Sequence, residues 1–172
     1  MNLRKTILTE HSKSQTLKVT KWVGDDEKRF AEIVDLLFSD EVRIVHRIAW
    51  VISCCAINHP DLVKPYFGKF IGLLSNPNLH PAVYRNILRL LQFIDVPKKY
   101  LGTLTNSSFY LLMKSDSPIA VKVFAMTVLK NISMKEPELK RELKMVVEDL
   151  VKENGGGIRA RGKKILKEIS NV

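Results

Sequence analysis

The sequence predicts an all-α fold: a right-handed α-α superhelix, or solenoid, of about four helix pairs preceded by N-terminal helices. Three observations predict this fold class. An apolar helical pattern recurs about every 37 residues, and turn and cap residues separate the amphipathic stretches from one another. In addition, no sustained alternation of apolar and polar residues indicates a strand.

The repeat is marked by four isoleucines, each of which ends a helical pattern. They are separated by 37, 38 and 37 residues and are Ile57, Ile94, Ile132 and Ile169. Mostly apolar or small residues recur three, four and seven positions before them, which traces one face of a helix. We therefore expect each segment to carry an inward-facing stripe at the same phase.

A second amphipathic stretch and a turn precede each of these segments, so each unit is predicted to be a helix–turn–helix. The whole chain, 1–172, is predicted to be one domain, with N-terminal helices followed by four helix pairs. The bounds are 1–24 for the helices and 25–58, 59–96, 97–135 and 136–172 for the pairs.

Within these units, residues 61–74 are predicted to form one helix, whereas the first helix of the third pair is predicted to be broken near Gly102 to Asn106. Asn2 is expected to cap the opening helix, and Ser12 to Gln15 is a capping-box pattern for a second helix that stops at Gly24.

A period near 37 fits ARM/HEAT-like repeats better than the 33 or 34 residues of ankyrin and TPR repeats. The chain also resembles a family. The segments at 46–50, 120–126 and 137–143 look like those of small HEAT-repeat proteins of Bacteroidetes bacteria, and the opening Leu3 to Lys5 and Glu10 to Lys13 fit the same resemblance. The resemblance covers nearly the whole chain and implies a fold. Proteins of this kind sometimes carry an adenylosuccinate-lyase label, but the signature loop of that lyase is absent from this sequence.

Composition and local patterns limit the classes of function. No apolar run reaches the roughly 18 residues of a membrane span, and the N-terminus lacks a signal-peptide pattern, so a cytoplasmic location without membrane contact is expected. Cys54 and Cys55 are adjacent, so they cannot staple distant segments, and they lack metal-site spacing.

The sequence contains no Gly-x-Gly-x-x-Gly, no P-loop, no His-Glu-x-x-His and no nucleophile elbow. We therefore expect no enzyme activity, no cofactor and no metal. Gly155 to Gly157 is interpreted as a turn between paired helices. His59 and His80 are expected in turns or caps, and His46 is expected to be a hydrogen-bonded core residue beside Trp50.

The charge balance is the informative feature, because 28 Lys and Arg against 18 Asp and Glu give a net charge of +10, which favours acidic partners. Polar and basic side chains recur on the second helices at positions −10, −9, −6, −5 and −2 from the marker isoleucines. These positions avoid the inward stripe, and Arg85, Arg89, Lys122 and Lys130 among them are expected to be solvated. The candidate partner surface comprises Arg47, Tyr84, Arg85, Arg89, Gln92, Lys122, Lys130, Arg159, Lys163, Lys164 and Lys167.

Two functions remain open from the sequence. The first is a non-catalytic protein–protein interaction scaffold, whose partner is another protein. The alternative is binding of DNA or RNA through a basic concave face, as in the HEAT-like DNA glycosylases, which the chain resembles in architecture only. The purely structural interpretation is also open, because the last helix of any solenoid needs a polar outer face.

Overall fold

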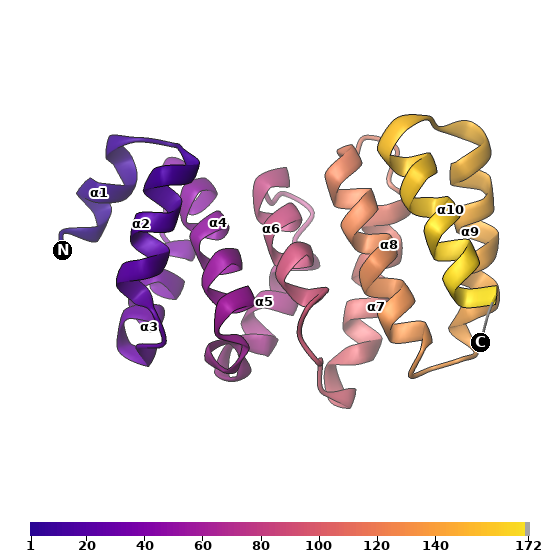
Figure 1. Cartoon of the computed structure of the whole chain (residues 1–172), viewed down its shortest axis with the longest axis horizontal. Coiled ribbons are helices and arrows are strands. Elements are labelled where there is room, and N and C mark those ends of the chain that lie inside the picture. The colour runs from indigo at the N-terminus through magenta and orange to yellow at the C-terminus, as the bar shows by residue number, and fades with distance from the viewer. Residues whose placement is uncertain (171–172) are drawn as a thin grey trace. The chain divides into compact units, whose positions relative to one another are not determined.

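The computed structural model describes residues 1–170, and this part of the chain is entirely helical apart from its turns. The α-helices are α1 (Leu3–Thr9), α2 (Lys13–Val23), α3 (Glu27–Leu37), α4 (Val42–Asn58), α5 (Phe67–Leu74), α6 (Pro81–Leu91), α7 (Lys98–Met113), α8 (Ile119–Ser133), α9 (Leu139–Glu153) and α10 (Gly156–Ser170), with a 3-10 helix, η1 (Pro60–Tyr66), before α5 (Figure 1). The prediction of an all-α fold is confirmed.

Local capping sets the starts of the first helices, as the sequence predicts. The Asn2 side chain accepts a hydrogen bond from the Lys5 backbone N–H at 3.1 Å, and the Ser12 hydroxyl accepts one from Gln15 at 3.1 Å. The Gln15 side chain does not complete the capping box, because its amide donates to the Thr6 carbonyl instead. Gly24 ends α2 with φ at 55°, a left-handed backbone conformation that favours glycine.

The described chain divides into two compact units. The first unit contains residues 1–70 and 78–95. Within it α4 packs against α2, α3 and α6, and Figure 1 shows α2, α4 and α6 side by side. The core of this unit includes Phe30, Ile33, Ile48 and Ile52, each with no exposed surface.

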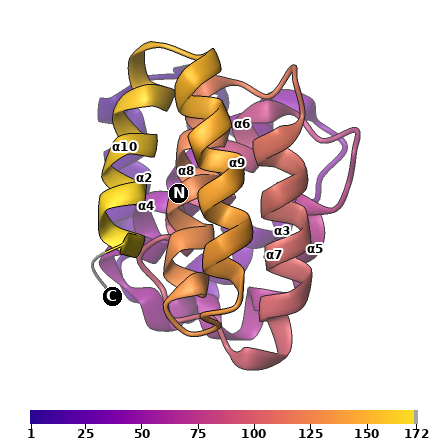
Figure 2. The same cartoon turned by 90° about the vertical axis from the view of Figure 1, so that its right-hand side faces the viewer.

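The second unit contains residues 71–77 and the chain from Val96 on. Here α8 packs against α7, α9 and α10, and Figure 2 shows α9 and α10 as neighbouring helices joined by a short turn. Gly162 of α10 lies close to α9. A side chain there would collide with Val151 Cγ2 and would come within 3.2 Å of Val147 Cγ1.

Burial confirms a helical repeat and corrects its first interval. Equivalent buried positions on α4, α6, α8 and α10 are separated by 39, 38 and 37 residues. These positions are Ile48, Ile87, Ala125 and Gly162. The marker isoleucines predict 37 for the first interval, because Ile57 is two residues out of phase and Ile94 lies beyond the end of α6.

Two helices differ from the prediction. Residues 98–113 form one continuous helix, so the predicted break at Gly102 to Asn106 is wrong. Gly102 and Asn106 lie on the exposed side, while Leu101, Leu104 and Thr105 are buried, and this packing outweighs the low helix propensity of the exposed residues. Residues 61–74 are not one helix, because Pro65 lacks the backbone N–H that an α-helix needs and the chain forms η1 there.

Candidate functional site

The first unit places half-exposed aromatic and basic side chains on two neighbouring helices. His46 and Trp50 lie one turn apart on α4, and Arg85 and Arg89 lie one turn apart on α6. Trp50 and Arg89 occupy equivalent places, each eight residues after the first residue of its helix. We call these four residues, His46, Trp50, Arg85 and Arg89, the α4–α6 face.

Two histidines join the starts of α4 and α6. The imidazole rings of His46 and His80 are stacked, with centroids 3.4 Å apart and an angle of 27° between their planes. His80 is the N-cap of α6, and its Nδ1 accepts a hydrogen bond from the Ala82 N–H at 3.1 Å. Because Nδ1 accepts, the neutral His80 carries its proton on Nε2. The cap predicted at His80 is confirmed.

His46 differs from its prediction. It is half-exposed and makes no hydrogen bond within the described residues, so its interpretation as a hydrogen-bonded core residue is wrong. Burial lowers the pKa of His46, and the nearby His80 and His11 lower it further because each disfavours a second positive charge. At neutral pH His46 is therefore predominantly uncharged.

Arg47 and His11 connect α4 to the N-terminal helices. The Arg47 Nη1 donates to the backbone carbonyls of Ile7 at 2.8 Å and Leu8 at 2.9 Å, where α1 ends. The His11 ring meets the Trp50 ring edge-on, with centroids 5.9 Å apart. Arg47 therefore holds α1 in place. Its guanidinium, which was predicted to face a partner, donates to the end of α1 instead.

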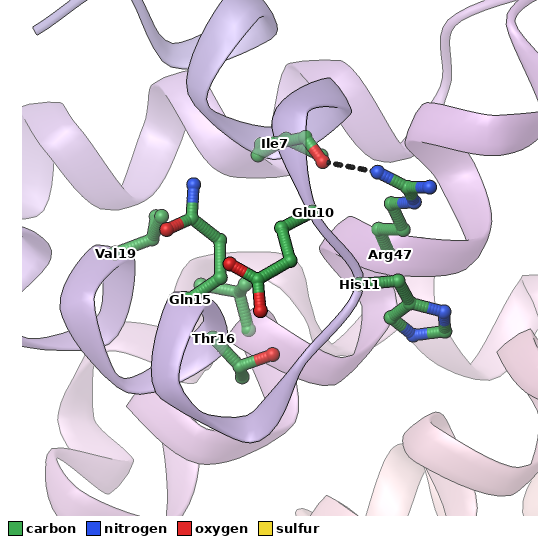
Figure 3. A pocket seen from close by; sticks show the side chains of 8 residues that line it. Ile7, Glu10, His11, Gln15, Thr16, Val19 and Arg47 are labelled. Carbon is green, nitrogen blue, oxygen red and sulfur yellow. Dashed lines mark hydrogen bonds between the residues drawn. The ribbon is translucent and has the colours of Figure 1, made fainter.

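Beside these contacts lies a cavity of about 10 Å³. Figure 3 shows it between the Arg47 side and the Gln15 and Thr16 side, with the Glu10 carboxylate and His11 among its lining residues. A volume of this size holds about one water molecule. It is therefore too small for an organic ligand.

Arg85 and Arg89 are the unpaired cations of the α4–α6 face. Within the described residues neither guanidinium makes an ion pair or a hydrogen bond. Their four-residue spacing on α6 places two like charges on adjacent turns, which is unfavourable without a compensating anion. Gln92, the C-cap of α6, donates to the Arg89 carbonyl at 3.3 Å.

In the second unit much of the predicted basic surface is already paired. Glu168 lies 3.2 Å from Lys130 and 3.8 Å from Lys164, so one carboxylate compensates two lysines. Arg159 Nε donates to the Val151 carbonyl at 3.2 Å. Lys163 and Lys167 are exposed on α10 and make no ion pair with any described residue.

Two predicted surface residues are buried. Tyr84 is 5% exposed and Lys122 is 7% exposed, so the expectation that both avoid the inward stripe, and that Lys122 is solvated, is wrong. Each lies three residues before a buried residue of the stripe, Ile87 and Ala125 respectively, and a three-residue step keeps a side chain on nearly the same helix face. In the second and third repeats position −10 therefore belongs to the flank of the inward stripe, whereas Arg159 at the same position of the fourth repeat is exposed. The alignment of the candidates from both units into one ridge stays a prediction.

Sequence reasoning missed the grouping of His11, His46, Trp50 and His80. The signal was present in part, because His46 and Trp50 share a helix face and His80 immediately precedes Pro81, which favours an N-cap. The contact between the two histidines depends on how α4 packs against α6, which no local pattern specifies. Within residues 1–170 these histidines do not form a group that could hold a metal ion.

Gly156 begins α10 with φ at 50°, and an added side chain at Gly157 would come within 3.4 Å of Ile119 Cγ2. The interpretation of Gly155 to Gly157 as a turn between helices is thus confirmed only for Gly155, because Gly156 and Gly157 form the first residues of α10. In the part of the chain that the structure describes, the helices are too short or too polar to cross a bilayer.

Comparison with known proteins supplies one match. A family model described as a HEAT repeat domain matches residues 3–169, which is nearly the whole chain. No curated protein and no solved structure matches the chain significantly.

Proposed function

The chain belongs to the HEAT repeat family, and on that premise we propose that it is a non-catalytic module that binds another protein. Helical-repeat proteins commonly use the surface formed by successive helices to bind partners. The observation that carries the proposal is the α4–α6 face, where Trp50 lies partly exposed on the helix next to two unpaired arginines. Tryptophan and arginine are the residue types that most often dominate the binding energy of protein interfaces.

A site-specific crosslinking experiment tests this proposal. A photo-crosslinking amino acid replaces Phe93, which is 62% exposed just after α6, in cells that naturally make the protein. The matched control carries the same group at Asp35, an exposed position on α3 in the same unit. We expect a discrete crosslinked protein from position 93 and none from position 35. Equal crosslinking from both positions, or none from either, contradicts the proposal.

Nucleic-acid binding is the second candidate. It is supported by the unpaired Arg85 and Arg89 and by the exposed Lys163 and Lys167. Fluorescence polarisation with short duplex DNA, single-stranded DNA and RNA tests it at low and at physiological salt. Micromolar binding that persists at physiological salt and weakens with added salt supports this function, because release of counterions accompanies phosphate binding. Absence of binding at both salt concentrations removes it.

A further inference from the structure

We propose that the α4–α6 face binds an acidic segment of a partner protein, with the partner's carboxylates on Arg85 and Arg89 and an apolar side chain against Trp50 and Phe93. This inference rests on the proposed function, since it names the chemistry of the partner at the same site.

The packing of α4 against α6 brings these residues onto neighbouring helices. The stacked His46 and His80 show that the two helices start side by side, and the helices lie next to each other in Figure 1. They therefore run in the same direction. His46 and Arg85 both lie four residues after the start of their helices, and Trp50 and Arg89 lie one turn further on. An extended segment lying across the two helices reaches an arginine and the tryptophan together.

The arginines indicate carboxylates. A guanidinium presents a planar fork of N–H donors that matches a carboxylate in a bidentate arrangement. Arg85 and Arg89 use none of these donors within the described residues, and each is partly sheltered by neighbouring side chains. Two such groups on adjacent turns repel each other, and an incoming pair of carboxylates removes that repulsion.

Aromatic side chains beside the arginines indicate an apolar contact. Phe93 continues the four-residue spacing of Arg85 and Arg89 and is 62% exposed. Trp50 keeps a partly exposed ring that His11 supports from one edge. A partner segment that combines acidic and aromatic residues covers both kinds of surface, whereas a purely acidic segment leaves the rings in contact with water.

The same face favours a protein segment over a nucleic-acid backbone. Affinity for a nucleic-acid backbone comes mainly from several Lys and Arg side chains that each neutralise a phosphate. Here Arg47 donates to the end of α1, and His46 is predominantly uncharged at neutral pH. Among the four residues of the α4–α6 face, the two on α4 are therefore aromatic, and Arg85 and Arg89 on α6 carry its positive charge.

The test uses fluorescence polarisation with two labelled probes, poly-L-glutamate and a random glutamate–tyrosine copolymer, at physiological salt. We expect the copolymer to bind more tightly than poly-L-glutamate. The Arg85→Glu/Arg89→Glu variant is expected to weaken copolymer binding by at least about tenfold, because it replaces attraction by repulsion at the contact.

A matched variant separates a site from a general effect of charge. Lys163→Glu/Lys167→Glu reverses two cations at the same four-residue spacing on α10, so it lowers the net charge by the same amount. We expect it to retain copolymer affinity to within about threefold, since neither lysine belongs to the α4–α6 face and the net charge alone is not expected to set the affinity. Phe93→Ser, at an exposed position, is expected to remove the preference for the copolymer over poly-L-glutamate.

Each other outcome overturns the inference. If the two charge-reversal variants lose copolymer affinity equally, the binding reflects a general effect of net charge. A labelled single-stranded oligothymidylate serves as a third probe. If it binds more tightly than the copolymer, and the Arg85→Glu/Arg89→Glu variant no longer binds it, the face is assigned to nucleic acid. A discrete protein crosslinked at position 93, together with copolymer binding that Arg85→Glu/Arg89→Glu leaves unchanged, shows that the module binds protein but not through acidic residues here.

Discussion

His46 and His80 are stacked at a centroid separation of 3.4 Å, although they lie on different helices and 34 residues apart in the chain. This contact joins the start of α4 to the N-cap of α6. It places two titratable rings against each other, with His11 as a third nearby imidazole. The first unit therefore has a packing contact that depends on protonation.

Acidification is expected to destabilise the protein through this histidine pair. The pKa of His46 is lower in the folded protein than in the unfolded chain, so the unfolded chain binds more protons as the pH falls below its own histidine pKa of about 6.5. The contribution to the free energy of unfolding is fully present above that pH and decreases as the pH falls toward the folded pKa.

Urea denaturation at several values between about pH 8 and about pH 5 checks this prediction. We expect His46→Gln to lose less stability on acidification than the wild-type protein. His80→Asn is the matched variant for the cap, because asparagine keeps an N-cap acceptor without an imidazole ring. An unchanged pH dependence in His46→Gln contradicts the prediction.

Gly162 is expected to reject even a methyl group. The Gly162→Ala Cβ collides with Val151, so we expect the free energy of unfolding to fall by about 1–3 kcal/mol despite the higher helix propensity of alanine. Gly102 is the matched control, since it lies within α7 and nothing approaches its added Cβ within 4 Å. Gly102→Ala is expected to stabilise by about 0.5–1 kcal/mol. Chemical denaturation measures both, and equal effects of the two substitutions contradict the packing argument.

Arg47 is expected to stabilise α1 and not to serve mainly as a binding residue. Arg47→Ala removes the donor that bonds the Ile7 and Leu8 carbonyls, so we expect a loss of about 1–2 kcal/mol in the free energy of unfolding. Amide hydrogen exchange in α1 is expected to accelerate more than exchange in α6. Arg43→Ala, at an exposed position on the same helix, is expected to change stability by less than about 0.5 kcal/mol. If the two variants behave alike, the bonds to α1 do not contribute to stability.

The two adjacent cysteines are expected to react at different rates. Cys55 is fully buried, and this burial raises the pKa of its thiol to about 12, so almost no thiolate is present at about pH 8. Cys54 is partly exposed. In native protein we expect iodoacetamide to modify Cys54 first, and peptide mass spectrometry after a time course gives the order. Equal rates of modification contradict the burial of Cys55.

Helix positions, caps and the approximate repeat were predictable because they depend on residues within one or two turns. Asn2, Ser12 and His80 each meet a backbone N–H two or three residues ahead, so their caps follow from the local sequence. The family match over residues 3–169 agrees with the repeat that the apolar pattern indicates.

Tertiary packing decided which helix faces are covered and which side chains meet. The position of Lys122 and Tyr84 relative to the marker isoleucines predicts an exposed face, but both follow the flank of the apolar stripe and are buried. The break expected in α7 is absent, since burial of one face outweighs the weak propensity of Gly102 and Asn106 on the other. The grouping of His46, Trp50, Arg85 and Arg89 depends on the contact between α4 and α6. The sequence determined the helices and their repeat because these depend on interactions between near neighbours. Only the tertiary structure decided the candidate site, because it depends on contacts between residues far apart in the chain.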